Sequence, residues 1–100
     1  MQMEFSGFDW DGGNRAKCEK HGVRAATIES LFTRPLAVLP DEAHSRMEPR
    51  FRAVGRSETG RLVFVVFTMR HGRIRPISAR YMHAKEAREY EKENPQLQKR

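Results

Sequence analysis

The stretch RFRAVGRSETGRLVFVVFTMRHGRIRPISARY, which runs from Arg50 to Tyr81, decides the fold of this chain. It holds three strand-like runs, separated by two short segments that contain glycine and have the composition of turns. The runs are Arg50–Arg56, Leu62–Met69 and Arg73–Tyr81, and the turns are Ser57–Arg61 and Arg70–Gly72. The first run alternates, with Phe51, Ala53 and Gly55 on one face and Arg50, Arg52, Val54 and Arg56 on the other. The second is apolar on both faces, which is typical of a central strand.

The segment before this stretch predicts one strand and two helices. These elements are Glu4–Trp10 as a strand and Asn14–His21 and Ala25–Phe32 as helices. Asp11 or Asn14 is the candidate N-cap of the first helix, and Gly22 is its C-terminal stop. The second helix has apolar residues at helical spacing on one face, and Pro35 prevents its continuation.

The remaining segments predict one more strand and a C-terminal helix. Leu36–Leu39 is an apolar strand, Pro40–Pro49 is a polar loop, and Ala84–Asn94 is a charged helix. Pro95 begins a basic tail, residues 95–100, that we expect to fray. The order β-α-α-β-β-β-β-α predicts an α+β fold with one domain over residues 1–94. Its sheet is mostly antiparallel, with two N-terminal helices and one C-terminal helix.

Composition favours a highly charged protein with a polyanionic partner. Nineteen Lys and Arg against thirteen Asp and Glu give a net charge of +6, with the basic excess clearest between Arg46 and Arg88. The longest strongly apolar run, Leu62–Phe67, is too short to cross a bilayer. The first residues do not have the pattern of a signal peptide, and the single cysteine, Cys18, favours a reducing compartment. We therefore expect the cytoplasm.

Three motifs in a fixed order resemble a known family. Phe8-Asp9-Trp10-Asp11, followed by NRAKCEKHGV from Asn14 to Val23, resembles an opening signature of the form FxWD…KHGV. Arg50–Ser57 (RFRAVGRS) is similar to a strand of the form RxxxxGxS/T, and Arg73–Arg80 (RIRPISAR) to one of the form RIRxISAR. Glu86 and Tyr90 follow at the usual places in the last helix. Together, over nearly the whole chain, these motifs resemble the BrnT family of toxins.

Resemblance to the BrnT family implies a RelE-like fold, metal-independent cleavage of RNA, and neutralisation by a BrnA-type antitoxin with a ribbon-helix-helix domain. The toxin would then contact DNA only indirectly, through the antitoxin, and no cofactor is implied. Two positions depart from the family's pattern. Asn14 stands where many members carry a lysine, and Arg24 stands where a polar helix cap is common.

Arg75 and Arg80 are the main candidates for catalysis. Cleavage without a metal needs cations near the scissile phosphate, because negative charge develops there when the 2′-hydroxyl attacks. Arginine suits this role, since it stays charged and can hold phosphate oxygens with two donors. The odd separation of the two arginines places them on opposite faces of the last strand, unless a bulge near Pro76 re-aims one of them. The alternative is that one of them forms a structural ion pair with Glu86 or Asp9.

Two histidines and several cations complete the predicted site. Because an imidazole in general changes its charge near neutral pH, His21, at the end of the first helix, and His83, before the last helix, are candidates for proton transfer. The alternative for His21 is a hydrogen bond to a carbonyl at the helix end. For Glu86 and Tyr90, which share a helix face with His83, an anchoring role is favoured. The expected RNA-binding cations are Lys17, Lys20, Arg52 and Arg56.

A metal site is not expected, and a second class of function stays open. Cys18 and His21 have the C-x-x-H spacing of half a zinc site, but no second pair in the sequence completes it. A non-enzymatic module whose exposed sheet face binds a protein or a nucleic acid also fits the basic composition. Incubation of the purified protein with long RNA and a metal chelator distinguishes the two, because only an enzyme cleaves the RNA.

Overall fold

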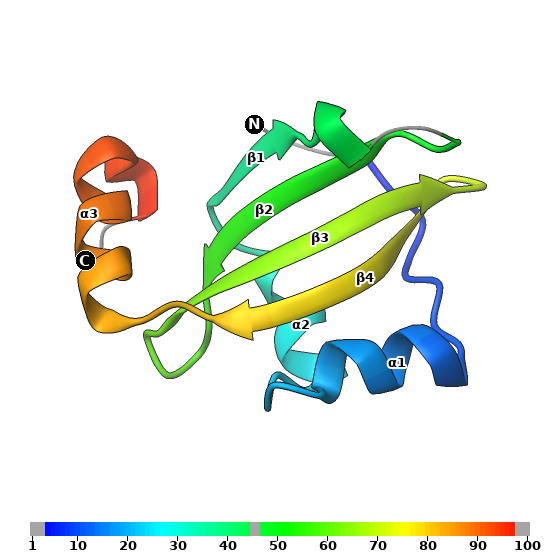
Figure 1. Cartoon of the computed structure of the whole chain (residues 1–100), viewed down its shortest axis with the longest axis horizontal. Coiled ribbons are helices and arrows are strands. Elements are labelled where there is room, and N and C mark those ends of the chain that lie inside the picture. Colours follow the sequence, from blue (N-terminus) through cyan, green and yellow to red (C-terminus); the bar gives the residue numbers. More distant parts are fainter. Residues whose placement is uncertain (1–3, 45–46, 98–100) are drawn as a thin grey trace.

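The computed structural model, which describes residues 4–44 and 47–97, contains one antiparallel sheet with the strand order β1-β2-β3-β4 (Figure 1). The strands are β1 (Leu36–Pro40), β2 (Arg50–Arg56), β3 (Leu62–Arg70) and β4 (Arg73–Tyr81). The helices are α1 (Gly12–Glu19), α2 (Ala25–Leu31) and α3 (Ala84–Glu93), with short 3-10 helices η1 (Glu42–His44) and η2 (Pro95–Leu97). This confirms the predicted α+β fold. None of the helices in the described ranges is long and apolar enough to span a membrane.

Helix α1 begins two residues earlier than predicted because Asp11 is its N-cap. The Asp11 side chain accepts a hydrogen bond from the backbone N–H of Asn14, and the Asn14 side chain accepts one from the N–H of Asp11. This reciprocal pair satisfies two backbone donors at the helix start. Helix α2 begins after Arg24, which makes no side-chain cap, and the carboxylate of Glu19 accepts from the N–H of Ala25 instead.

The prediction of a strand over Glu4–Trp10 is wrong. Gly7 has a φ of +127°, which interrupts a regular strand, and only an isolated parallel bridge joins Phe8 to Ile74 of β4. The ring of Phe8 packs edge-to-face on that of Phe32, with centroids 5.6 Å apart. The segment therefore lies against the start of β4 and contributes its aromatic side chains to the core.

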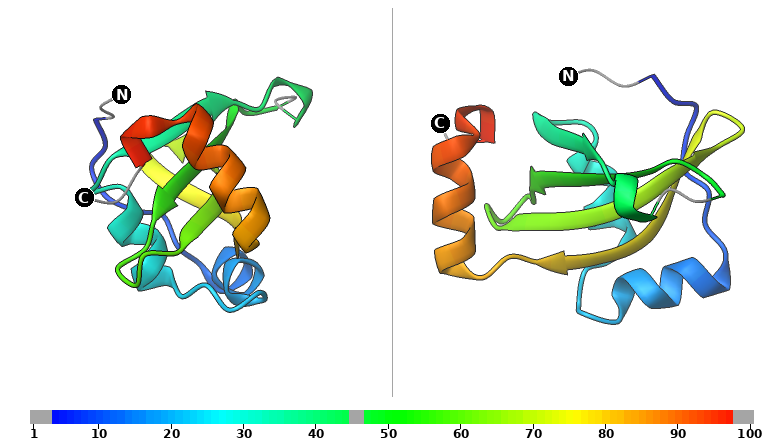
Figure 2. Two further views of the ribbon diagram at one scale, coloured as in Figure 1. Left: turned by 90° about the vertical axis from the view of Figure 1, so that its left-hand side faces the viewer. Right: turned by 45° about the horizontal axis from the view of Figure 1, so that its top comes forward.

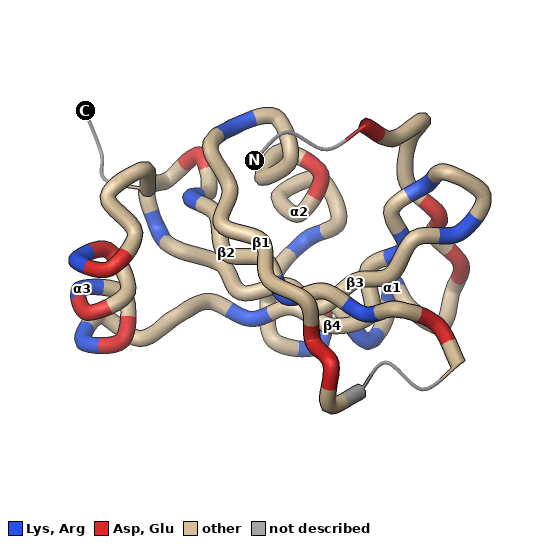
Figure 3. The backbone as a smooth tube through the Cα atoms, turned by 90° about the horizontal axis from the view of Figure 1, so that it is seen from above, with Lys and Arg blue, Asp and Glu red and all other residues tan. Residues whose placement is uncertain are grey.

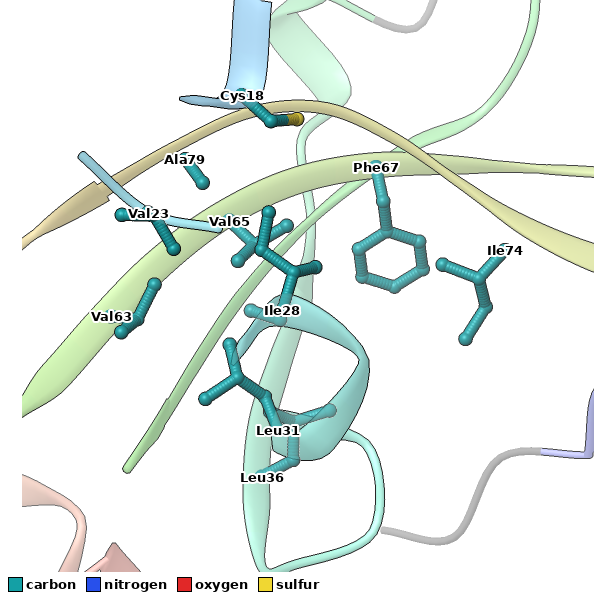
Figure 4. Packing of buried hydrophobic residues seen from close by; sticks show 11 residues of the cluster. Cys18, Val23, Ile28, Leu31, Leu36, Val63, Val65, Phe67, Ile74 and Ala79 are labelled. Carbon is teal, nitrogen blue, oxygen red and sulfur yellow. The ribbon is translucent and has the colours of Figure 1, made fainter. Parts of the chain in front are cut away.

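The sheet has two apolar clusters, one on each face. The larger cluster joins α1 and α2 to β2, β3 and β4, and its buried members include Ile28, Leu31, Val65 and Phe67 (Figure 4). Gly55 belongs to this face, since a Cβ built on it would lie 2.8 Å from Cδ1 of Leu36. The smaller cluster, on the opposite face, joins β1, β2 and β3 to the C-terminal elements. Helices α1 and α2 thus cover one face, and α3 stands across the end of the sheet where β4 finishes (Figure 2).

The C-terminal residues Pro95–Leu97, which we expected to fray, pack on the sheet. They form η2, and Leu97 is only 3% exposed because it packs in the smaller cluster. The guanidinium of Arg56 donates to the carbonyl oxygens of Leu97 and Gly60 and pairs with Glu91 of α3. Apolar burial and this arginine hold α3 and η2 on the sheet. The rest of the predicted tail, residues 98–100, lies outside the described residues.

Candidate functional site

A β-bulge places Arg75 and Arg80 on the same face of the sheet. Arg75 lies opposite Thr68 and Arg80 lies opposite Phe64, but the register shifts between Val66 and Phe67, so that Ile77 is left without a partner on β3. Thr68 and Phe64 are four positions apart on one strand and share a face, and therefore so do the two arginines. Pro76, which has no N–H to donate, precedes the extra residue, as is common at bulges. Of the two arrangements that the sequence left open, the structure has the one with the bulge.

Asn14 connects helix α1 to this bulge. Its amide nitrogen donates to the carbonyl oxygen of Pro76 at 2.9 Å and to that of Asp9 at 2.9 Å, and the residue is buried. The residue that departs from the family's lysine pattern thus has a structural role here. It fixes the start of α1 beside β4, which brings the side chains of the first helical turns to the sheet face that carries Arg75.

Every charged residue on β2, β3 and β4 is an arginine. Strand pairing puts Arg50, Arg52 and Arg56 of β2 on the same face as Arg75 and Arg80 of β4. We define the arginine face by Arg50, Arg52, Arg75 and Arg80, because the guanidinium of Arg56 bonds to α3 and η2. These three strands carry no Asp or Glu, and acidic residues reach the arginines from neighbouring segments, for example from α3, where they alternate with lysine and arginine (Figure 3). A row of arginines therefore lies on a sheet surface that α1 and α2 do not cover.

A pocket of about 500 Å³ opens on the arginine face, between α1 and the end of the sheet far from α3. This volume suits a small ligand or one or two nucleotides of a longer chain. Four cations line it, namely Lys17, Arg50, Arg70 and Arg75. Its acidic lining residues are Asp11 and Glu48, and the lining is completed by Gly13, Asn14, Thr68, Pro76 and Ile77. Four structural elements thus supply one cation each to a single concave surface.

Arg75 is held at the pocket by two carboxylates. Its guanidinium lies 2.7 Å from Oδ2 of Asp11 and 3.4 Å from Oδ1 of Asp9, and its side chain is only 17% exposed. The pKa of Asp11 is lowered by the backbone N–H of Asn14 and by the hydrogen bond from Arg75. Asp11 therefore stays ionised while it caps α1 and orients Arg75. The contact between Arg75 and Asp9 is one of the two structural ion pairs that the sequence offered as alternatives to catalysis.

Glu48 and Arg70 form a second ion pair on the rim of the pocket. Nε and Nη2 of Arg70 donate to the two carboxylate oxygens of Glu48 at 2.8 and 3.0 Å. This bidentate contact lowers the pKa of Glu48 and raises that of Arg70, and the charges of Arg75 and Arg50 lower the Glu48 pKa further. The hydroxyl of Thr68 donates to the carbonyl oxygen of Pro49, which anchors the end of the loop beside Glu48.

Arg80 lies on the same face but at the α3 end, outside the pocket lining. Its guanidinium donates to both carboxylate oxygens of Glu86 at 3.0 and 2.9 Å and lies over the ring of Phe64, 5.2 Å from its centroid. The hydrogen bond from Arg80 lowers the pKa of Glu86 to about 2, and the same contact raises the pKa of Arg80. The backbone N–H of His83 donates to Glu86 at 3.3 Å, so His83 borders this ion pair.

The other predicted site residues do not all lie in the pocket. Lys17 lines the pocket, and Arg52 is exposed on the arginine face. Lys20 and His21 are exposed beyond the last turn of α1 and are not part of the pocket lining. Arg56, the last of the predicted RNA-binding cations, has its guanidinium in the contacts that fasten α3 and η2.

Sequence reasoning missed Glu48, Arg50 and Arg70 as site residues. Arg50 carried a signal, because the alternation of β2 already placed it on the same face as Arg52. Glu48 lies in a loop without a periodic pattern, and Arg70 was assigned to a turn. Only the packing of the loop against the ends of β2 and β3 brings these side chains to Arg75.

The described residues contain no cluster of three or more His, Cys, Asp and Glu side chains that could hold a metal ion. Cys18 is fully buried in the larger cluster, and burial raises its pKa to about 11. The thiol is therefore neutral at physiological pH and acts as a core residue.

Fold and site together define a small α+β protein with a pocket lined by four cations and two carboxylates. The comparison with known families agrees with this description. Residues 10–86 match the family described as the ribonuclease toxin BrnT of type II toxin–antitoxin systems, and the chain belongs to this family. No curated protein matches the chain. It is accordingly a ribonuclease toxin with an antitoxin partner.

Proposed function

We propose that the protein is a metal-independent endoribonuclease that cleaves RNA in the pocket at Arg75 and thereby arrests growth. The observation that carries this proposal is the convergence of Lys17, Arg50, Arg70 and Arg75 on one pocket. In the reaction, the 2′-hydroxyl attacks the adjacent phosphate, the bond to the 5′-oxygen breaks, and a 2′,3′-cyclic phosphate forms. Negative charge builds on the phosphate oxygens, and fixed guanidinium groups stabilise it.

Arg75 is the best-placed catalytic cation. Its pairs with Asp9 and Asp11 hold the guanidinium beside the pocket before RNA arrives, so little reorganisation is needed. Arg80, at the other end of the arginine face, would contact the same strand at a neighbouring phosphate, with Arg52 between the two ends. Lys20 would add to long-range attraction, whereas the guanidinium of Arg56, although predicted to bind RNA, is engaged by Glu91 and Leu97.

Two proton transfers accompany the cleavage, one from the 2′-hydroxyl and one to the leaving 5′-oxygen. His21 and His83 are the residues that the sequence offers for these steps, and both are exposed. Since neither lines the pocket, a role for either requires RNA that extends along α1 or along the arginine face to α3. Replacement of each histidine by alanine tests this directly.

The test of the proposal is RNA cleavage in the presence of EDTA. Purified protein is incubated with a long single-stranded transcript, and the products are examined for 2′,3′-cyclic phosphate and 5′-hydroxyl ends. We expect cleavage by the wild type and none by the Arg75→Ala, Arg80→Ala double variant. Retardation of the RNA without cleavage would support the non-enzymatic basic module instead. In bacteria, expression of the toxin alone should stop growth, and normal growth at high expression would oppose the proposal.

The antitoxin is proposed to be of the BrnA type, with a ribbon-helix-helix domain that binds DNA as a dimer. Its other segment would cover the arginine face around Arg52, Arg75 and α3, where apolar burial and charge pairing reinforce each other. This arrangement would block RNA without a change of fold, would leave DNA contacts to the antitoxin, and would operate in the cytoplasm. Hydrogen exchange on free and bound toxin tests the location. Protection confined to α1 and α2 would contradict it.

A further inference from the structure

Glu48 lines the pocket but has no role in the cleavage steps described above. A cleavage site built only of cations can stabilise the transition state, but it cannot take the proton of the 2′-hydroxyl. Among the described residues that line the pocket, the carboxylates are those of Asp11 and Glu48. A base must lie within hydrogen-bond reach of the hydroxyl or be linked to it by one water. The candidate bases within the pocket are therefore these two side chains.

Asp11 is committed to structure. One of its carboxylate oxygens accepts from the N–H of Asn14 and caps α1, and the other accepts from Arg75. Glu48 has no such role in a helix. Its partner, Arg70, is 44% exposed on the pocket rim, and exposed ion pairs of this kind exchange at little cost. The pair uses Nε and Nη2 of Arg70, so a phosphate that binds at Nη1 would leave Glu48 paired and beside the bound strand.

We infer that Glu48 is the general base of the RNA cleavage proposed above and that Arg70 is its positioning partner. The inference rests on the proposed function. Glu48 takes the proton of the 2′-hydroxyl as its oxygen forms the new bond to phosphorus. The bond from phosphorus to the 5′-oxygen breaks, and this oxygen takes a proton from solvent water that enters the pocket. Glu48 then returns its proton to the solvent, so the reaction consumes no other reagent.

The pH profile follows from the charges around Glu48. The groups that face it are Arg70 from β3, Arg50 from β2, Arg75 from β4, and Lys17 and Asp11 at α1. The cations keep the pKa of Glu48 below its ordinary value of 4.5, with the hydrogen bond from Arg70 as the largest cause. The cleavage rate should therefore fall only when the pH drops below about 4.5. A histidine base would place this acid limb of the profile near pH 6.5.

The experiment measures single-turnover cleavage of a mixed-sequence RNA transcript in EDTA, with the protein in saturating excess so that the rate reports chemistry. Glu48→Gln should lower the rate about 100-fold or more while RNA binding stays intact. Arg70→Gln breaks the same ion pair but keeps the carboxylate. It should retain the rate within about tenfold and move the acid limb upward, because the Glu48 pKa rises.

The outcomes separate this inference from the proposed function. Equal losses in the Glu48→Gln and Arg70→Gln variants would mean that only the ion pair matters, and the base would be elsewhere. A wild-type acid limb near pH 6.5, or a Glu48→Gln rate within tenfold of wild type, would overturn the inference while cleavage that depends on Arg75 survives. Absence of any cleavage by the wild type would overturn both.

Discussion

The salt dependence of RNA binding should identify which arginines contact phosphates. Single-stranded RNA releases counterions when Lys and Arg neutralise its phosphates, and each contact contributes about −0.7 to the slope of log affinity against log salt. If Lys17, Arg50, Arg52 and Arg75 each contact one phosphate, the slope is about −2.8. Binding should then weaken roughly 150-fold between 50 and 300 mM KCl.

Arg52→Gln and Arg75→Gln should each flatten this slope by about 0.7, which reduces the loss over the same salt range to roughly 40-fold. Fluorescence anisotropy with a 2′-O-methyl RNA measures the affinity, because this RNA lacks the attacking hydroxyl and stays intact. Circular dichroism shows whether each variant remains folded.

Two control variants remove a charge elsewhere. Arg24→Gln removes an exposed cation before α2, the helix that packs on the opposite face of the sheet. Arg56→Gln removes a guanidinium that already bonds Glu91 and the carbonyl oxygens of Leu97 and Gly60. Neither should change the slope by more than about 0.2. Unchanged slopes in the Arg52 and Arg75 variants, with a flatter slope for Arg24→Gln, would refute the assignment of RNA to the arginine face.

Three further predictions concern stability. Gly55→Ala should cost about 1–3 kcal/mol in urea unfolding, because the new methyl group would lie 2.8 Å from Cδ1 of Leu36. No loss would mean that the larger cluster packs loosely there. Leu97→Ala should cost about 2–3 kcal/mol, since Leu97 is buried, and a cost near zero would contradict the docking of η2. Glu86→Gln should cost roughly 0.5–1 kcal/mol at neutral pH, a small value because the side chains of Arg80 and Glu86 are 43% and 36% exposed. Since Arg80 lowers the Glu86 pKa from 4.5 to about 2, this contribution is present above pH 4.5 and is lost as the pH falls toward 2. If the difference in unfolding free energy between Glu86→Gln and wild type were the same at neutral pH and near pH 2, the ion pair would not be its cause.

Much of the sheet is predictable from the sequence because its signals are local. The alternation of Arg50–Arg56, the apolar run that starts at Leu62 and the glycine-containing turns between the strands predicted β2, β3 and β4 to within one residue. Gly7 had the opposite effect. Its positive φ and the packing of the neighbouring aromatic rings against α2 converted an expected strand into an irregular segment, and both depend on tertiary contacts.

The candidate site was predictable only in part because it is assembled from distant segments. Arg75 and Lys17 were anticipated from motifs, and both line the pocket. That Arg75 and Arg80 share a face depends on one unpaired residue, Ile77, which alternation alone cannot reveal. Glu48 reaches the pocket because its loop is anchored at Pro49 by Thr68, a contact between residues 19 positions apart. No periodic pattern encodes such a contact.

The most direct test of the central claim compares Arg75→Ala with Arg24→Ala in single-turnover cleavage of RNA in EDTA. Each variant removes one arginine, but only Arg75 lines the pocket. Loss of a fixed cation from the transition state should lower the Arg75→Ala rate by about 100-fold or more. The Arg24→Ala rate should stay within about twofold of wild type. Cleavage by Arg75→Ala at the wild-type rate, with the protein folded, would contradict the account.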